Sequence, residues 1–301
     1  MTSLSSFFSD NIWLVLIGSL VGITCSQVGS LLVLRKQSMM GDAISHTVLL
    51  GIVAAFLVSS SMAPIYMLPG AIAAGLLTAF FAEMIGSSKT MNGDGAIGIT
   101  FTTLFAISII LLNFYAGDTH LDLDCVLYGE LTYAPFDVWE WQGKDLGPRS
   151  FWILLSLSLV NSFLLWISYR PVQFASFDPV VARAQGVSIR WWNYFVMAAV
   201  SITTVLNIES VGAILVVAML IVPATSGYLL ASSMLGMILI ACFFSVLASF
   251  GGVYASAWLD ASPGAAIAIA AGVLLSLVVA YQHRRPRMAS QVVENQSLTS
   301  P

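Results

Sequence analysis

The chain has 301 residues, of which 58% are hydrophobic and 9% are charged, and its formal net charge at pH 7 is −4. A soluble domain carries about 25% charged residues, so this composition excludes a water-soluble globular protein. Long apolar runs recur from end to end, and a membrane-spanning helix needs about 20 such residues. The composition therefore indicates an all-α, polytopic membrane protein.

Nine apolar segments predict the transmembrane helices in chain order. Eight helices result instead if the short gap at Asn207–Ser210 does not separate two of them. We expect residues 1–283 to form the transmembrane domain and the polar residues 284–301 to form a short disordered tail. The apolar segments are 11–34, 38–60, 64–86, 95–115, 151–169, 191–207, 211–230, 233–251 and 264–281.

Basic residues predict the orientation of these helices. Lysine and arginine concentrate in cytoplasmic loops, and here they follow the first, third, fifth and last segments. Nine spans then place the N-terminus outside and the C-terminus in the cytoplasm. The residues are Arg35, Lys36, Lys89, Arg170, Arg183, Arg190, Arg284, Arg285 and Arg287.

Small residues recur at a spacing of four in the first segment, at Gly18, Gly22, Ser26 and Ser30. Such a stripe allows two helices to approach closely in lipid. We expect this face to pack against another helix.

The stretch MMGDAISHTVLLG in the second segment places Asp42 and His46 on one helical face. With Lys36 placed at the inner boundary of the membrane, His46 lies ten residues further along, or about 15 Å at the rise of a helix, which is half of a ~30 Å hydrocarbon core. Ionisable groups at such a depth usually face a cavity and mark a pathway. A pair that only hydrogen-bonds within the bundle is the alternative.

A carboxylate with an imidazole suits Mn²⁺, Zn²⁺ or Fe²⁺. Two ligands in one chain are too few for tight coordination. A two-fold dimer would bring two copies of Asp42 and two of His46 to one axis. The pair therefore favours a site shared with a second, similar subunit.

A long acidic loop, residues 117–149, is expected on the outer side. Its negative charge would attract cations or a basic partner. The loop could equally be a solvated segment without a binding role. Four clustered side chains form a possible weak metal or docking site: Asp118, His120, Asp122 and Asp124.

The inner stretch SFDPVVARAQGVSIR predicts a short helix over about 178–186. Asp178 is a good N-cap, Pro179 suits the first helical position, and Gly186 suits the position after the last turn. This helix could lie on its own bundle or on another protein. Its remaining candidate contact residues are Val180, Val181, Arg183 and Gln185.

Glu209 is read as the remaining acid at membrane level, near the outer end of its segment. It could be solvated at the interface or could act as an outer gate that attracts the ion. Pro223 is expected to kink the next helix.

No sequence motif supplies an energy source or a hydrolytic centre. The string GSSKT at Gly86 to Thr90 lacks the glycine pattern of a phosphate-binding loop, and HExxH and GxSxG are also missing. Energy for transport must therefore come from a partner or from an ion gradient.

Several of these stretches resemble one family, the metal-ion permeases of ATP-binding-cassette importers for manganese, zinc or iron (the ABC-3 family). The resembling blocks are LLVLRKQSMMGDAISHTVLLG, SFDPVVARAQGV and SVGAILVVAMLIVPAT. DLDCVLYGEL is similar to a stretch common in one of the family's two paralogous permease types. The blocks stand in the family's order and cover nearly the whole chain.

The resemblance implies a multi-pass permease of the bacterial plasma (inner) membrane with no permanently bound cofactor, whose substrate is a divalent metal. It implies a second permease, identical or paralogous, two cytoplasmic ATPase subunits that carry out ATP hydrolysis, and an extracytoplasmic metal-binding protein. Asp42 and His46 occupy the positions of the family's proposed metal site. Residues 178–186 fall at its ATPase-contact helix. Where the family often has proline, this chain has Leu50, so we expect a straighter second helix.

Two other functions remain open on the sequence alone. A permease of the same fold could carry a metal chelate or a small organic molecule. An intramembrane metal-dependent hydrolase would need a third ligand and a base at the depth of Asp42 and His46, and the sequence offers neither.

Overall fold

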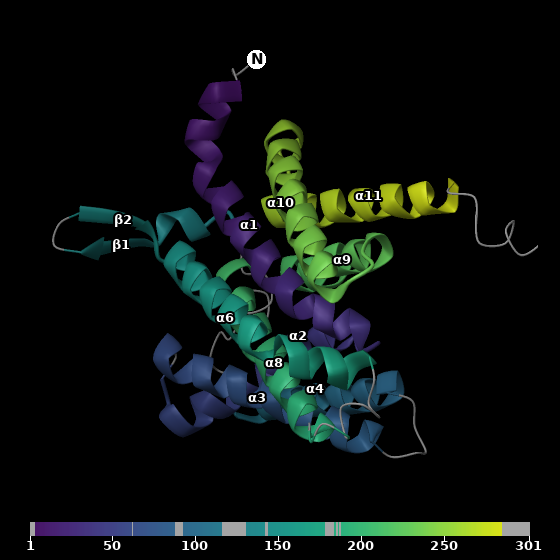
Figure 1. Ribbon diagram of the computed structural model, residues 1–301. Coiled ribbons are helices and arrows are strands. Elements are labelled where there is room, and N and C mark those ends of the chain that lie inside the picture. The colour runs from purple at the N-terminus through teal and green to yellow at the C-terminus, as the bar shows by residue number, and fades with distance from the viewer. Residues whose placement is uncertain are drawn as a thin grey trace, which may run out of the picture.

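The computed structural model describes residues 4–61, 63–87, 93–115, 131–141, 144–177, 184, 186 and 188–284 (Figure 1). Within this part of the chain, nine helices are long and apolar enough to cross a membrane. The predicted helical membrane fold is therefore confirmed. The helices are α1 (Leu4–Leu34), α2 (Met40–Ser59), α3 (Pro64–Gly86), α4 (Gly93–Tyr115), α6 (Arg149–Phe177), α8 (Ile189–Val211), α9 (Ala213–Leu230), α10 (Met234–Leu259) and α11 (Pro263–Arg284).

The break between α8 and α9 differs from the predicted one. Residues Asn207–Ser210 are helical, and the chain breaks at Gly212 instead. The side chain of Asn207, at the edge of the predicted gap, is buried, accepts a hydrogen bond from Thr24 Oγ1 at 3.0 Å and donates one to the Thr203 carbonyl at 2.6 Å. Partners inside the bundle thus allow this polar residue to stay helical.

Two other helices run further than their apolar segments. α6 continues through Pro171 to Phe177, well beyond residue 169, and α10 continues to Leu259 instead of ending at 251. Hydropathy marks the part of a helix that suits lipid, whereas backbone hydrogen bonding extends past it. α2 is a single uninterrupted helix.

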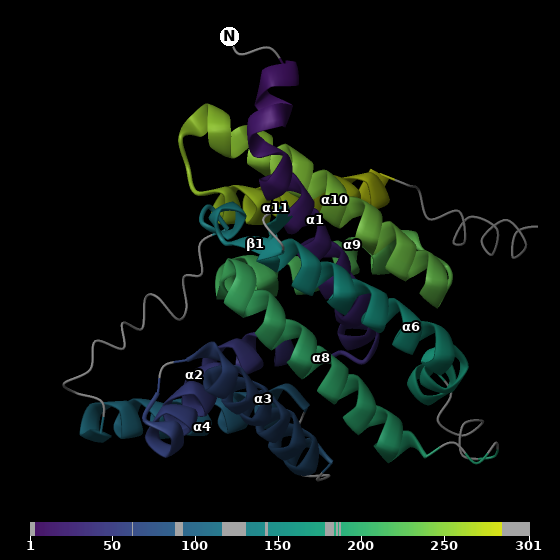
Figure 2. The ribbon, with the colours of Figure 1, turned by 90° about the vertical axis from the view of Figure 1, so that its left-hand side faces the viewer.

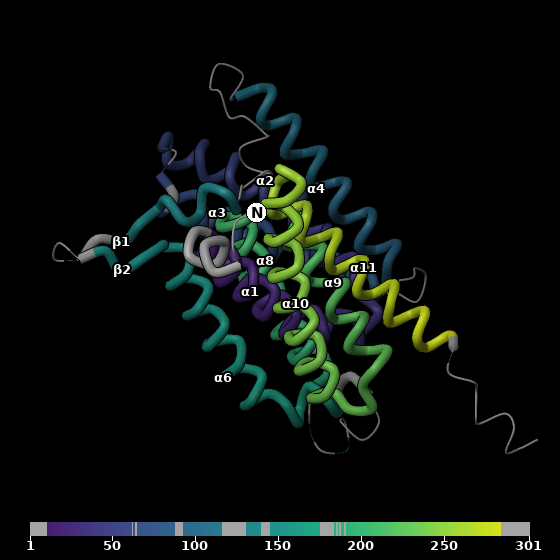
Figure 3. Tube along the Cα trace, turned by 90° about the horizontal axis from the view of Figure 1, so that it is seen from above, coloured from purple at the N-terminus to yellow at the C-terminus, as the bar shows by residue number. Residues whose placement is uncertain are grey.

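The helices form two groups. One consists of α2, α3 and α4, which pack on one another, and the other of α1, α9, α10 and α11. Figure 2 shows α8 running between the groups, where it contacts α1, α2 and α3. Seen from above, α4 and α6 lie on opposite sides of the molecule (Figure 3).

The small residues of α1 pack against α10 as predicted. A Cβ atom added to Gly22 would lie 2.7 Å from the Ser245 Cβ. One turn further on, Ser26 Oγ donates to the Ala241 carbonyl at 3.3 Å. The predicted close helix packing is therefore confirmed for this stripe.

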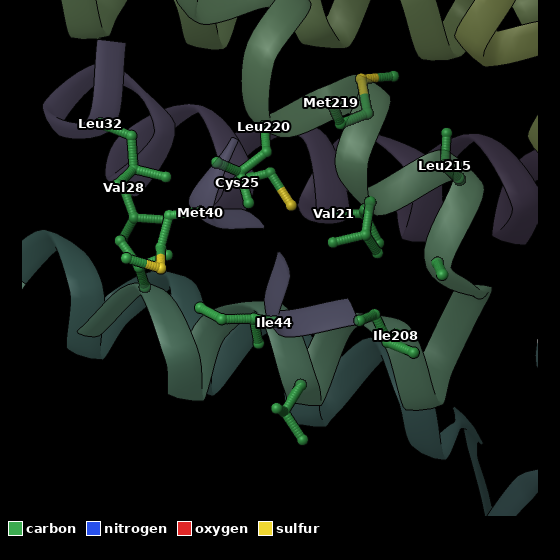
Figure 4. Close-up of a cluster of buried hydrophobic side chains, with 14 of the residues drawn as sticks. Val21, Cys25, Val28, Leu32, Met40, Ile44, Ile208, Leu215, Met219 and Leu220 are labelled. Carbon is green, nitrogen blue, oxygen red and sulfur yellow. The ribbon is translucent and has the colours of Figure 1, made fainter. Parts of the chain in front are cut away.

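The buried core lies where α1, α2, α8 and α9 meet (Figure 4). Met40 and Ile44 of α2 are almost completely buried there. Because they stand four residues apart, they define one face of α2. Asp42 and His46 are offset from that face and stay partly exposed.

A small hairpin was not predicted from the sequence. β1 (Val138–Trp141) pairs antiparallel with β2 (Lys144–Pro148), after a short 3₁₀ helix at Ala134–Phe136. The hairpin projects from the helices (Figure 1). It occupies the end of the predicted acidic loop.

Candidate functional site

The start of α2 places Asp42 and His46. The chain between α1 and α2 is a hydrogen-bonded turn in which Lys36 has φ 58°, so α2 begins only at Met40. His46 therefore lies six residues, or about 9 Å, along α2, which is less than the ~15 Å obtained by counting helical residues from Lys36. Asp42 lies in the first turn of the helix.

The two side chains form a pair with the spacing of metal ligands. His46 Nε2 lies 3.6 Å from Asp42 Oδ1, and the side chains are 38% and 42% exposed, respectively. Two ligand bonds of about 2.1 Å that meet at a tetrahedral angle hold their donor atoms about 3.4 Å apart. The pair can therefore share one ion with little movement.

Aromatic rings of α4 hold the imidazole ring of His46. Phe101 stacks on it with centroids 5.8 Å apart, and Phe105 meets it edge-on at 5.5 Å. His46 Nδ1 is buried and has no hydrogen-bond partner among the described residues. An unpaired buried polar atom carries a free-energy cost.

A cavity of about 490 Å³ lies beside the pair. Asp42, Ser45 and His46 form one wall, on α2. The opposite wall belongs to α9 and is apolar, so all the side-chain atoms that could bind a metal lie on one side. Within the described chain, no three His, Cys, Asp or Glu side chains lie close enough together to hold a metal ion. The α9 wall consists of Ala213, Ile214, Val217 and Ala218.

Glu209 does not line this cavity. It is exposed near the end of α8, just before Gly212, and the charge of Arg149 acts on it. It is also not the remaining acid at membrane level, because Glu83 lies inside the candidate span Ile65–Gly86. The sequence interpretation overlooked Glu83.

Two predicted sites fall mostly outside the described residues. All four members of the outer cluster, Asp118 to Asp124, lie outside them, and so does the 178–186 helix except for two positions. Ala184 is helical, and Gly186 has φ 75°, the left-handed conformation typical of the position after a helix.

A third polar group was missed altogether. Arg35, Asn193 and Glu83 are joined by hydrogen bonds where α1, α3 and α8 come together. The available signal was Glu83 itself, an ionisable residue inside an apolar run.

Comparisons with known proteins identify the family. A family model described as "ABC 3 transport family" matches residues 10–282. The manganese transport system membrane protein MntD of Bacillus subtilis is 44% identical over 261 residues, which cover 87% of this chain and 88% of that protein. The zinc transport system membrane protein TroD of Treponema pallidum is 37% identical over 264 residues, which cover 88% of this chain and 72% of that protein.

A solved structure agrees with the sequence relatives. PsaBC from Streptococcus pneumoniae in complex with Fab matches with a TM-score of 0.73 and 28% identity, over 92% of this chain and 95% of that chain. With nine apolar helices among its described residues, the chain belongs to the ABC 3 transport family and is a multi-pass permease of the bacterial plasma membrane.

Proposed function

We propose that the chain imports a divalent transition metal, with Asp42 and His46 as one half of a transient metal site. The observation that carries this proposal is the pair itself, 3.6 Å apart on one wall of an open cavity. An oxygen and a nitrogen ligand suit Mn²⁺ and Zn²⁺ alike. The 44% identical relative is named for manganese and the 37% identical one for zinc, so manganese is the first candidate and zinc the second.

A second permease supplies the missing ligands in this proposal. One fact supports it: the opposite wall of the cavity, on α9, is apolar and offers no further metal ligand. A carrier must release its ion, so a few ligands divided between two subunits serve it better than a closed cage.

The remaining parts of the importer are proposed from the sequence. ATPase subunits in the cytoplasm would contact residues 178–186, and an extracytoplasmic protein would deliver the metal. The C-terminus would lie in the cytoplasm, as the basic loops predict. Asp118, His120, Asp122 and Asp124 would attract the arriving metal or its carrier, and Glu209 would act as an outer gate.

Metal accumulation in cells that express the whole importer tests the site. We expect Asp42→Asn and His46→Gln each to lower manganese accumulation by at least about tenfold, because altering even the groups that support metal ligands costs about 10- to 100-fold. Manganese, zinc and iron are measured together by mass spectrometry. The ion whose accumulation falls is the substrate.

Asp260→Asn is the matched control. Asp260 ends α10 in a left-handed conformation with φ 51°, which asparagine tolerates, and it does not line the cavity. Accumulation should stay at the wild-type level. If the Asp42 and His46 variants also accumulate metal normally, the site assignment is wrong.

A further inference from the structure

Three helix ends are connected by a polar relay, which we define as Arg35, Asn193 and Glu83. Arg35 Nη1 donates to Asn193 Oδ1 at 2.9 Å, and Asn193 Nδ2 donates to Glu83 Oε1 at 2.9 Å. Arg35 directly follows α1, Asn193 lies in the first turns of α8, and Glu83 lies in the last turn of α3. The amide of Asn193 thus joins a cation to an anion.

Both hydrogen bonds are partly buried and charge-assisted, which makes them stronger than neutral ones. Burial lowers the pKa of Arg35 to about 10, and the Glu83 carboxylate opposes this shift. At neutral pH the guanidinium therefore keeps its proton and its donor role. The relay is a specific contact, because Asn193 uses its amide oxygen for Arg35 and its amide nitrogen for Glu83.

A cavity of about 190 Å³ lies beside the relay. Its lining includes Asn193 and Glu83 as well as Gln37 and Met40 of the turn into α2. Side chains at this end of the bundle therefore have room to move relative to one another. Elsewhere α3 and α8 touch more closely: a Cβ atom on Gly75 would lie 2.3 Å from Ser201 Oγ.

The relay lies between the two regions that a transporter must connect. Asn193 is seven residues after Gly186, the end of the proposed ATPase-contact helix. On the other side, Arg35 leads into the hydrogen-bonded turn, where Gln37 N–H donates to the Leu32 carbonyl and Met40 N–H to the Gln37 carbonyl. That turn starts α2, whose first turn carries Asp42.

We infer that the Arg35–Asn193–Glu83 relay transmits movement from the ATPase-contact segment to the metal-binding helix, with Asn193 as the positioning residue. This inference rests on the proposed function. When the segment before α8 moves, the first turns of α8 move with it. Through its hydrogen bonds to Arg35 and Glu83, Asn193 then displaces the end of α1 and the end of α3. The turn at Lys36 transmits this displacement to Asp42.

A donor–acceptor exchange tests the relay in the assembled transporter, with its partner permease and ATPases, in proteoliposomes. Asn193→Asp keeps an acceptor for Arg35 but sets a second carboxylate against Glu83. Adding Glu83→Gln to this variant supplies an amide that donates to the new carboxylate. The measured quantity is manganese taken up per ATP hydrolysed, with manganese chloride as the probe.

In the single Asn193→Asp variant we expect manganese uptake per ATP hydrolysed to fall about tenfold. The rate of ATP hydrolysis should stay within about twofold of wild type. The double variant should recover most of the ratio. Asn113→Ala, on an exposed asparagine of α4, is the control and should not change it. Equilibrium manganese binding should be unchanged in every variant, because Asp42, His46 and the two rings that contact His46 are all intact.

Two results would overturn the relay: a wild-type ratio in the single variant, or a double variant that assembles but stays as uncoupled as the single one. If the single variant does not assemble, the double variant is compared with the wild type alone. A double variant whose ratio of manganese uptake to ATP hydrolysis stays far below that of the wild type then overturns the relay. The proposed function fails separately, when the wild-type transporter takes up neither manganese nor zinc.

Discussion

At the scale of single residues, His46 is held by its surroundings as much as by α2. Phe101 and Phe105 contact its ring from α4, and Asp42 lies near its Nε2. A metal ligand whose ring is fixed before the ion arrives loses less conformational entropy on binding. The aromatic side chains should therefore contribute to metal affinity without touching the metal.

Replacement of Phe101 by alanine should weaken metal binding. An aromatic pair contributes about 0.5–1.5 kcal/mol beyond its buried area, so we expect the dissociation constant for manganese to rise about 2- to 10-fold. Equilibrium dialysis of the assembled transporter measures it. Phe243→Ala is the control, because Phe243 is 59% exposed on α10. Equal constants for wild type and Phe101→Ala would show that the stacking does not position the ligand.

The pair itself could be predicted from the sequence, because a spacing of four residues fixes which helical side chains are neighbours. The phenylalanines could not, since nothing local in the sequence tells which helix packs beside α2. The remaining metal ligands of the proposed site could not be predicted from this sequence at all. The proposal places them on another chain.

At the scale of elements, the junction of α8 and α9 joins the helix that lies between the two groups to one of those groups. Gly212 has φ 89° and ψ 161°, a region that only glycine occupies readily. The junction lets the chain leave α8, in contact with α3, and enter α9, which forms the apolar wall of the cavity. One backbone conformation thus sets the wall opposite Asp42.

Gly212→Ala should destabilise the permease by about 1–3 kcal/mol through backbone strain. The thermal unfolding midpoint of the detergent-purified protein should fall accordingly. Gly272→Ala in α11 serves as the control: a Cβ atom there meets nothing within 4 Å, and alanine suits a helix interior. If both variants unfold at the same temperature as the wild type, a side chain at position 212 does not strain the junction.

The sequence predicted helices well and their ends poorly. The apolar runs identify each span because lipid requires them. The ends depend on tertiary partners, as at Asn207, whose hydrogen bonds to Thr24 and Thr203 keep α8 helical where a loop was expected. The hairpin of β1 and β2 was missed because short paired strands leave little periodic signal.

At the scale of the whole molecule, the cavity lies between the two helix groups. Its ligand wall belongs to α2 of one group and its apolar wall to α9 of the other. A relative movement of the groups would therefore widen or narrow the space beside Asp42 and His46. α8 crosses between the groups and carries Asn193 near its start, so it would connect the proposed ATPase-contact segment to that movement.

The central claim is that the chain contributes half of one shared metal site. Manganese bound at saturation to the purified, assembled transporter, counted by mass spectrometry, tests it most directly. We predict about one ion per pair of permeases in the wild type, none when Asp42→Asn is present, and the wild-type value with Asp260→Asn. An Asp42→Asn transporter that still binds manganese at the wild-type ratio would contradict the claim.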